Sequence, residues 1–158
     1  MANNTQWNTL ARALRDLHGA LVARARTDYL RENQIGGDIR PGELLRLLTT
    51  DPYFDWLRSL SELMVEIDVI HDRADDAKAL DELAGAVRGA VEFLITAPAA
   101  GAPATPFAQR YWPHVQDDPH VAMAHGAVKR ALSTWPAPDV ATLRDHRLKV
   151  AAAAADSE

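Results

Sequence analysis

Apolar residues recur along the chain at the spacing of an α-helix and almost never alternate with polar ones, which favours helices over strands. The first apolar stripe predicts a helix from about residue 5 to about residue 32, where the pattern stops at Gly36 and Gly37. The stripe consists of Trp7, Leu10, Leu14, Leu17, Leu21, Ala25 and Tyr29.

The stretch from Pro41 to Asp72 predicts two further helices in succession. Residues 44–48 are expected to form a short apolar helix. Asp51 then suits the N-cap of a long amphipathic helix, and Pro52 suits its first position, where the missing N–H is harmless. The stripe of this long helix is the widest in the chain and contains Tyr53, Trp56, Leu57, Leu60, Met64 and Ile67.

A third long helix of about 20 residues is predicted after the charged break HDRADD, again from its apolar spacing. Residues 96–106, TAPAAGAPATP, contain three prolines, one glycine and no large apolar side chain. We therefore expect them to form a non-helical connection. The stripe of the third long helix contains Leu80, Leu83, Val87, Val91, Leu94 and Ile95.

Pro106 is expected to start a short helix that Pro113 interrupts or closes. Asp118 and Pro119 repeat the Asp-Pro start and predict the last core helix, whose stripe contains Val121, Ala124, Val128 and Leu132. Beyond Trp135 the sequence Pro-Ala-Pro breaks the pattern. Residues 139–150 can form an amphipathic helix, and the alanine-rich tail after them is expected to fray.

Four long helices and two short ones predict an all-α, single-domain antiparallel bundle over residues 1–135. Residues 136–158 are expected to add a peripheral C-terminal helix and the frayed tail. Each buried methylene contributes about 0.8 kcal/mol, whereas exposed ion pairs contribute little. The apolar stripes, and not surface charges, are therefore expected to hold the bundle together.

Composition narrows the classes of function. The chain has no cysteine, which excludes disulfides, thiolate metal sites and a cysteine nucleophile. The net charge of −5 argues against a nucleic-acid partner, because such proteins usually present a basic surface to the phosphates. The N-terminus lacks an apolar signal core, and no apolar run approaches the ~20 residues that cross a bilayer. We expect a cytoplasmic protein without a membrane partner.

The segment PGELLRLLTTDPYFDWLRSLSELMVEID, together with the later DPHVAMAHGAVKRAL, resembles a family of short, all-helical bacterial proteins with no assigned function. The resemblance covers roughly residues 10–132 and is most specific between Asp51 and Asp68. It implies a helical fold and a bacterial cytoplasmic origin. It implies no catalytic residue, because the family has none assigned.

Histidines on the apolar stripes suggest, as one alternative, a metal-binding bundle whose site could support hydrolysis. His71 falls near the centre of its stripe, His18 and His125 lie beside theirs, and Asp68 precedes His71 by one helical turn. The Asp-x-x-His spacing lets two side chains on one helix face bind one ion. In the interpretation that we favour, these histidines are neutral and hydrogen-bonded within the core. A di-iron site is not expected, since Glu82 and Glu92 point away from the Val87 stripe and the first helix has no inward carboxylate in its middle.

Signatures of catalysis are absent from the sequence. There is no glycine-rich phosphate loop and no serine in a nucleophile elbow. Glu62 and Glu66 are expected to be exposed neighbours on a solvated helix face, without the pocket that acid–base catalysis needs. We therefore expect no catalytic residue and no cofactor.

Two aromatic groups suggest binding instead, one at the start of the central helix and one after the connection. They could line an apolar pocket or a partner groove, and two valines on the central helix form a second apolar strip beside them. Packing within the core is the alternative. The candidate residues are Tyr53, Phe54, Trp56, Val65, Val69, Phe107, Tyr111 and Trp112. The sequence thus favours a non-catalytic binding protein, with a homodimer or protein partner ahead of a small apolar ligand.

Overall fold

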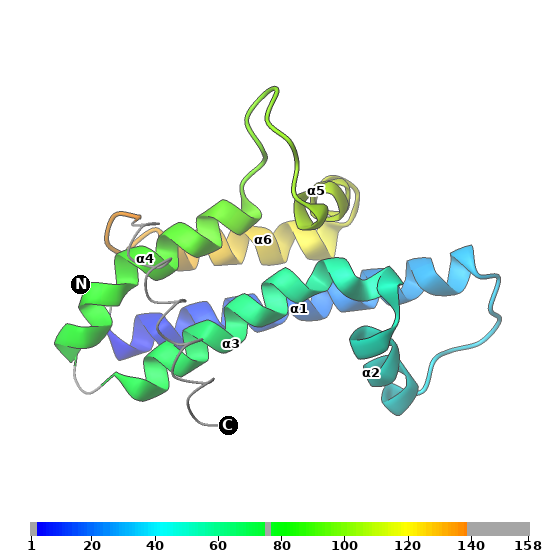
Figure 1. Cartoon of the computed structure of the whole chain (residues 1–158), viewed down its shortest axis with the longest axis horizontal. Helices are drawn as coiled ribbons and strands as arrows, with labels where there is room; N and C mark the ends of the chain where they lie inside the picture. The colour runs from blue at the N-terminus through cyan, green and yellow to red at the C-terminus, as the bar shows by residue number, and fades with distance from the viewer. Residues whose placement is uncertain (1–2, 75–76, 139–158) are drawn as a thin grey trace.

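The computed structural model describes residues 3–74 and 77–138, and within these ranges every regular element is helical (Figure 1). The prediction of an all-α chain is confirmed. In chain order the elements are α1 (Asn4–Glu32), α2 (Pro41–Thr50), the 3₁₀-helix η1 (Pro52–Leu57), α3 (Arg58–Arg73), α4 (Ala77–Ile95), α5 (Pro106–Asp117) and α6 (Pro119–Leu132).

Side-chain caps start these helices where the sequence predicted. The Asp51 side chain accepts a hydrogen bond from the backbone N–H of Tyr53, and Asp118 accepts from the N–H of His120. Both prolines that follow these aspartates occupy the first helical position. At α1, Asn3 and Gln6 form a reciprocal capping box, which satisfies N–H groups that have no partner within the helix.

Residues 52–57 differ from the prediction, because they form a 3₁₀-helix and not the first turns of a long α-helix. A 3₁₀-helix has 3.0 residues per turn, so each side chain is rotated by about 120° from the last. This rotation turns Phe54 inward, and only 1% of its surface is exposed. The sequence had predicted Phe54 to lie away from the core, beside the second apolar strip of Val65 and Val69 on the outer face of the helix, and for Phe54 that prediction is wrong.

Pro113 also differs from the prediction, since it neither interrupts nor closes α5, which continues to Asp117. A proline inside a helix removes the hydrogen bond to the carbonyl four residues earlier, here that of Gln109. Pro113 and Gln109 are both exposed, so this carbonyl lies on the solvent side of the helix and can be hydrated. The helix therefore tolerates the lost bond.

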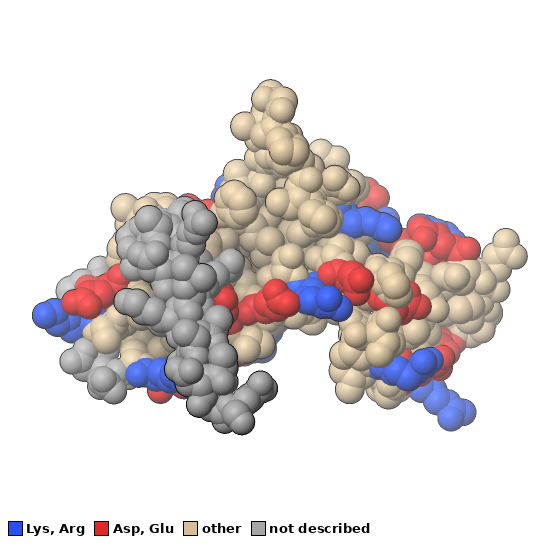
Figure 2. All heavy atoms as spheres, in the orientation of Figure 1, with Lys and Arg blue, Asp and Glu red and all other residues tan. Residues whose placement is uncertain are grey.

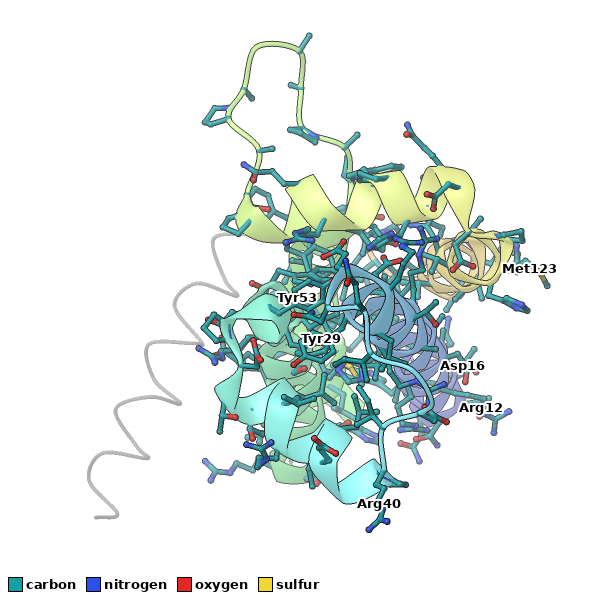
Figure 3. All side chains as sticks on the ribbon, turned by 90° about the vertical axis from the view of Figure 1, so that its right-hand side faces the viewer. Arg12, Asp16, Tyr29, Arg40, Tyr53 and Met123 are labelled. Atoms are coloured by element: carbon teal, nitrogen blue, oxygen red, sulfur yellow. The ribbon has the colours of Figure 1, made fainter. Side chains whose placement is uncertain are left out.

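Helix α1 lies at the centre of the molecule, where it packs against α3, η1, α5 and α6, while α4 covers α3 and α5 crosses α6 (Figure 1). Tyr29 of α1 and Tyr53 of η1 lie side by side, with ring centroids 5.3 Å apart (Figure 3). The predicted stripe of α1 faces the core. Its buried members are Trp7, Leu10, Leu14, Leu17, Leu21 and Ala25.

The chain after α6 packs back against α1 and α4. Trp135 is 4% exposed and packs against Trp7, with ring centroids 4.8 Å apart. Arg88 of α4 donates to the Trp135 carbonyl at 2.6 Å. The helix predicted over residues 139–150 lies outside the described residues. In the part that is described, no helix is long and apolar enough to cross a membrane.

Candidate functional site

The connection between α4 and α5, residues 96–105, projects from the body of the molecule (Figure 1). It contains only alanine, proline, threonine and glycine, and the projection carries no charged side chain (Figure 2). None of these side chains is large enough to reach back and fill the space beside the α4 end. The composition that prevents helix formation therefore also leaves room for a cavity.

A cleft of about 450 Å³ lies between this connection and the C-terminal turns of α4. We call it the loop cavity. Among the described residues that line it, Phe93, whose surface is 71% exposed, is the one large apolar side chain, and Glu92 is the one charged group. The cavity is lined by Gly89, Glu92, Phe93, Thr96, Ala97, Pro98, Ala99, Ala102, Pro103, Thr105, Ala108 and Pro138.

A second cavity of about 330 Å³ lies between the α4 end and helices α5 and α6. We call it the polar cavity, because an imidazole, an amine, an indole and a carboxylate all line it. It shares Glu92, Thr96 and Ala97 with the loop cavity, so the two flank the same turn of chain. Its lining residues are Glu92, Ile95, Thr96, Ala97, Trp112, His125, Lys129 and Leu132.

His125 in the polar cavity is hydrogen-bonded to Tyr111 and buried, and these two features bear on its tautomer and its charge. Burial raises the pKa of Tyr111, so its hydroxyl stays protonated and lies 2.6 Å from Nδ1 of His125. Burial and, secondly, the charge of Lys129 lower the pKa of His125, which keeps the imidazole neutral at pH 7. We assign the Tyr111 hydroxyl as the donor to Nδ1 and the ring proton to Nε2.

The other polar groups of this cavity differ in their partners. The Glu92 carboxylate accepts from Nε of Arg88 at 2.9 Å, and this ion pair compensates its charge. The indole Nε1 of Trp112 is buried and has no acceptor among the described residues. A buried donor without a partner is costly, and a ligand in the cavity does not reach this one, because the atom is fully buried.

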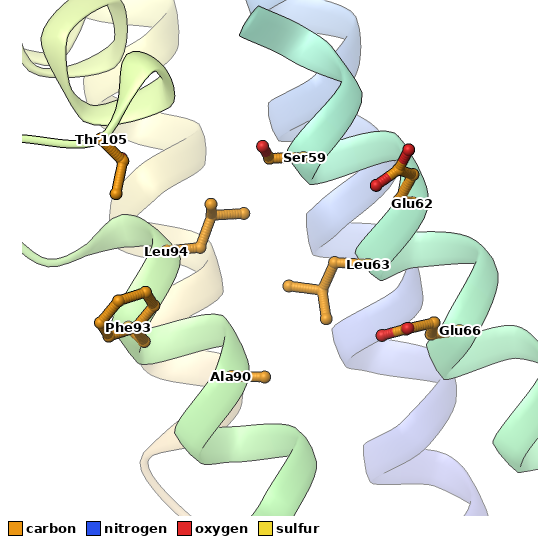
Figure 4. Close-up of a pocket in the computed structure, with 8 residues that line it drawn as sticks. All are labelled: Ser59, Glu62, Leu63, Glu66, Ala90, Phe93, Leu94 and Thr105. Atoms are coloured by element: carbon orange, nitrogen blue, oxygen red, sulfur yellow. The ribbon is translucent and has the colours of Figure 1, made fainter. Parts of the chain in front are cut away.

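A third cavity of about 230 Å³ opens between α3 and α4. Glu62 and Glu66 project from α3 on one side of it, opposite Phe93 and Leu94 of α4 (Figure 4). The expectation that these glutamates lack a pocket is therefore wrong. Among the described residues, Ser59 is the only hydroxyl group from α3 that lines the cavity, and no histidine, lysine or arginine there lines it to activate that hydroxyl.

The three histidines considered as metal ligands form hydrogen bonds to three different residues in separate parts of the structure. His18 is hydrogen-bonded to Ser61 at 3.0 Å, whereas His71 is hydrogen-bonded to Asn4 at 2.6 Å and stacks on Trp7. Ser61 and His71 are ten residues apart on α3, which is about 15 Å along the helix. His125 is bonded to Tyr111 instead.

Asp68 is exposed on α3, where it lines a small pocket together with Arg15 of α1. In the described ranges, no three histidine, aspartate or glutamate side chains are grouped so that they could hold a metal ion. The structure therefore does not bring His18, Asp68, His71 and His125 together.

The predicted binding aromatics lie mainly in the core. Phe54, Trp56, Phe107 and Tyr111 are buried, and the ring centroids of Trp56 and Phe107 are 5.8 Å apart. The two aromatic groups thus meet, but as core packing and not as the walls of a groove. Among the remaining candidates, Val65 is 62% exposed, Trp112 lines the polar cavity, and Tyr53 and Val69 are half-buried.

The sequence argument missed Glu92, Phe93, Lys129 and the small side chains of residues 96–105 as parts of a site. One signal was present. Phe93 is a large apolar residue off the stripe of its helix, three residues before a connection that carries no large side chain. An exposed aromatic beside a segment of small residues is a typical element of a binding cleft.

A cluster of charges on the other side of α5 serves the fold. Arg24 donates to Asp28, Asp117 and Asp118, at 3.1, 2.9 and 3.5 Å. Asp28 is buried and also accepts from Arg31 at 2.8 Å. The pairs link α1 to the junction of α5 and α6, and each of these acids is compensated by an arginine.

Comparisons of the chain with protein-family models, with curated proteins and with solved structures gave no significant match. Any functional proposal must therefore be argued from the cavities themselves.

Proposed function

We propose that the protein binds a small, mainly apolar organic molecule in the loop cavity and catalyses no reaction on it. The volume of about 450 Å³ lies within the range of about 300–1,000 Å³ that is typical of small-molecule sites. The lining also fits that class, because it is mostly apolar with few polar groups. It contains no nucleophile with an adjacent base, which is why we propose binding alone.

The observation that carries the proposal is the position of Phe93. Its ring is 71% exposed and faces a cleft whose other wall consists of small side chains. Exposure of an aromatic ring to water is unfavourable by about 25 cal/mol for each Å² of apolar surface. A ligand in the cleft would cover this ring, and the small residues opposite would not hinder its entry.

The arrangement of the helices supports a stable frame for such a site. We infer an antiparallel bundle around α1, in agreement with the packing of α3 and α6 along it.

The proposal also includes the cytoplasmic location and the bacterial origin that we expect from the sequence. Both follow from sequence features and the family resemblance alone.

Fluorescence titration with the neutral apolar dye N-phenyl-1-naphthylamine tests the proposal. The wild-type chain should bind the dye with saturation, and Phe93→Ala should weaken binding about tenfold, because it removes one wall of the cleft. Met123→Ala is the matched control. Met123 is 72% exposed on α6 (Figure 3) and lines neither the loop cavity nor the polar cavity.

Because Phe93 is mostly exposed, its truncation should leave the unfolding transition nearly unchanged, which can be verified by circular dichroism. Equal dye binding by the wild-type chain and Phe93→Ala would contradict the proposal. Equal losses in Phe93→Ala and Met123→Ala would also contradict it, since the dye would then be attached to exposed apolar residues in general.

Contact with a second protein, or with a second copy of this chain, is the other candidate. It is favoured by the outer strip of α3, where Val65 is 62% exposed and Val69 lies one turn further along the same face. Light scattering over a range of protein concentrations tests the homodimer. A mass near twice 17.3 kDa that returns to the monomer mass in Val65→Glu would support it, and a monomer mass throughout would exclude it.

A further inference from the structure

We propose that the ligand carries a carboxylate next to its apolar part, and that the polar cavity binds this carboxylate through His125 and Lys129. This inference rests on the proposed function, because it assumes that the apolar part lies in the loop cavity. It adds the chemical class of the ligand and assigns a role to a second cavity.

The two cavities are adjacent. Glu92, Thr96 and Ala97 line both of them, so a ligand needs to cross only the turn of chain where α4 ends. A molecule of moderate length can therefore place its apolar part beside Phe93 and its polar end beside α6.

The groups of the polar cavity that have no charged partner are donors. In the tautomer that we assign, Tyr111 donates to Nδ1 of His125, and the ring presents Nε2–H. Lys129 has three N–H donors and forms no ion pair within the described residues. The Nε1–H of Trp112 also has no acceptor there, but it is fully buried and adds no donor to the cavity. A carboxylate supplies two oxygens with about four lone pairs, which matches this set of donors.

The acidic residue of the cavity does not oppose this match. Glu92 is paired with Arg88 at 2.9 Å, so its charge is compensated outside the cavity. An amine is the less suitable ligand, because a protonated amine only donates and would meet Lys129 with the same charge. A carboxylate brings one negative charge to one uncompensated lysine.

Calorimetric titration at pH 7.5 with three ligands of equal chain length tests the inference. Octan-1-ol, octanoate and octylamine share the apolar part and differ only in the end group. We expect octanoate to bind about tenfold more tightly than octan-1-ol, the effect of one charge-assisted hydrogen bond. Lys129→Met should abolish this preference and leave octan-1-ol binding unchanged. Arg130→Met is the matched control, since Arg130 adjoins Lys129 and does not line the cavity.

A second measurement reports on His125. In proton NMR spectra of the wild-type chain, the His125 ring signal should shift with octanoate and much less with octan-1-ol. Equal affinities for octanoate and octan-1-ol would overturn the carboxylate inference and leave the proposed function standing, and so would tighter binding of octylamine. An octanoate preference that persists in Lys129→Met would overturn the assigned residues. Failure of all three ligands to bind would refute the proposed function itself.

Discussion

Nη1 of Arg24 lies 2.9 Å from Oδ1 of Asp117, while Nε of the same guanidinium lies 3.1 Å from Oδ2 of Asp28. One side chain thus joins a buried aspartate of α1 to the last residue of α5. The guanidinium is planar and offers several N–H donors in a fixed geometry, so it can serve both carboxylates at once. The helices that carry the polar cavity are held against α1 at this point.

Replacement of Arg24 by methionine should destabilise the fold by about 2 kcal/mol, because it removes a partner from the buried Asp28 carboxylate. The loss is smaller than for a fully isolated charge, since Arg31 still donates to Asp28. Urea unfolding followed by circular dichroism measures it. Arg58→Met is the control, because Arg58 pairs with Asp55 on an exposed surface and should cost less than about 1 kcal/mol. Equal effects would contradict the structural role of Arg24.

Stability should fall as the pH is lowered from 7.5 to 5.5. Burial lowers the pKa of His18, His114 and His125 below the usual value of 6.5. The unfolded chain therefore binds protons near pH 6.5, at which the folded chain does not, and acidification favours unfolding. Melting temperatures across this range test the sign. His114→Gln should reduce the slope, whereas a melting temperature that rises on acidification would contradict the assignment.

Arg88→Met should loosen the chain after α6. The substitution removes the hydrogen bond to the Trp135 carbonyl and the ion pair with Glu92, and we expect a loss of about 1–2 kcal/mol. It should also weaken octanoate binding, because Glu92 would then place an uncompensated negative charge in the polar cavity. Urea unfolding and calorimetry measure the two effects. Undiminished octanoate affinity would show that the Arg88–Glu92 pair has no part in the site.

His71→Leu separates the structural role of His71 from a metal-binding role. The substitution removes the hydrogen bond to Asn4 and the stacking on Trp7, so we expect a modest loss of about 1 kcal/mol. Elemental analysis of the wild-type and variant proteins should give the same metal content, well below one ion per chain. If the wild-type protein contained stoichiometric zinc or iron and the variant did not, the result would support metal binding by His71.

Much of the helical architecture could be predicted from the sequence, because its signals are local. The apolar spacing of α1 and the Asp-Pro starts at Asp51 and Asp118 act within one or two turns, and the structure confirms them. The 3₁₀ geometry of residues 52–57 and the passage of α5 through Pro113 depend on neighbours and on solvent. Periodicity at 100° per residue contains neither kind of information.

The candidate site was less predictable, because a cavity is a property of how elements pack. The sequence argument searched the stripes for polar residues and found His125, which does line a cavity, together with His18 and His71, which are bonded elsewhere. The small size of the side chains of residues 96–105 was not considered. Those small residues create the loop cavity only when α4 and α5 are in place on either side of them.

Chemical-shift mapping of backbone amides with octan-1-ol tests the central claim most directly. Spectra of the ¹⁵N-labelled chain with and without the alcohol should show saturable shifts concentrated between Gly89 and Thr105, with the largest near Phe93, Ala97 and Ala102. Binding of an apolar molecule beside the α4 end predicts this result. Absence of shifts at saturating octan-1-ol, or shifts centred on Val65 and the outer face of α3, would contradict it.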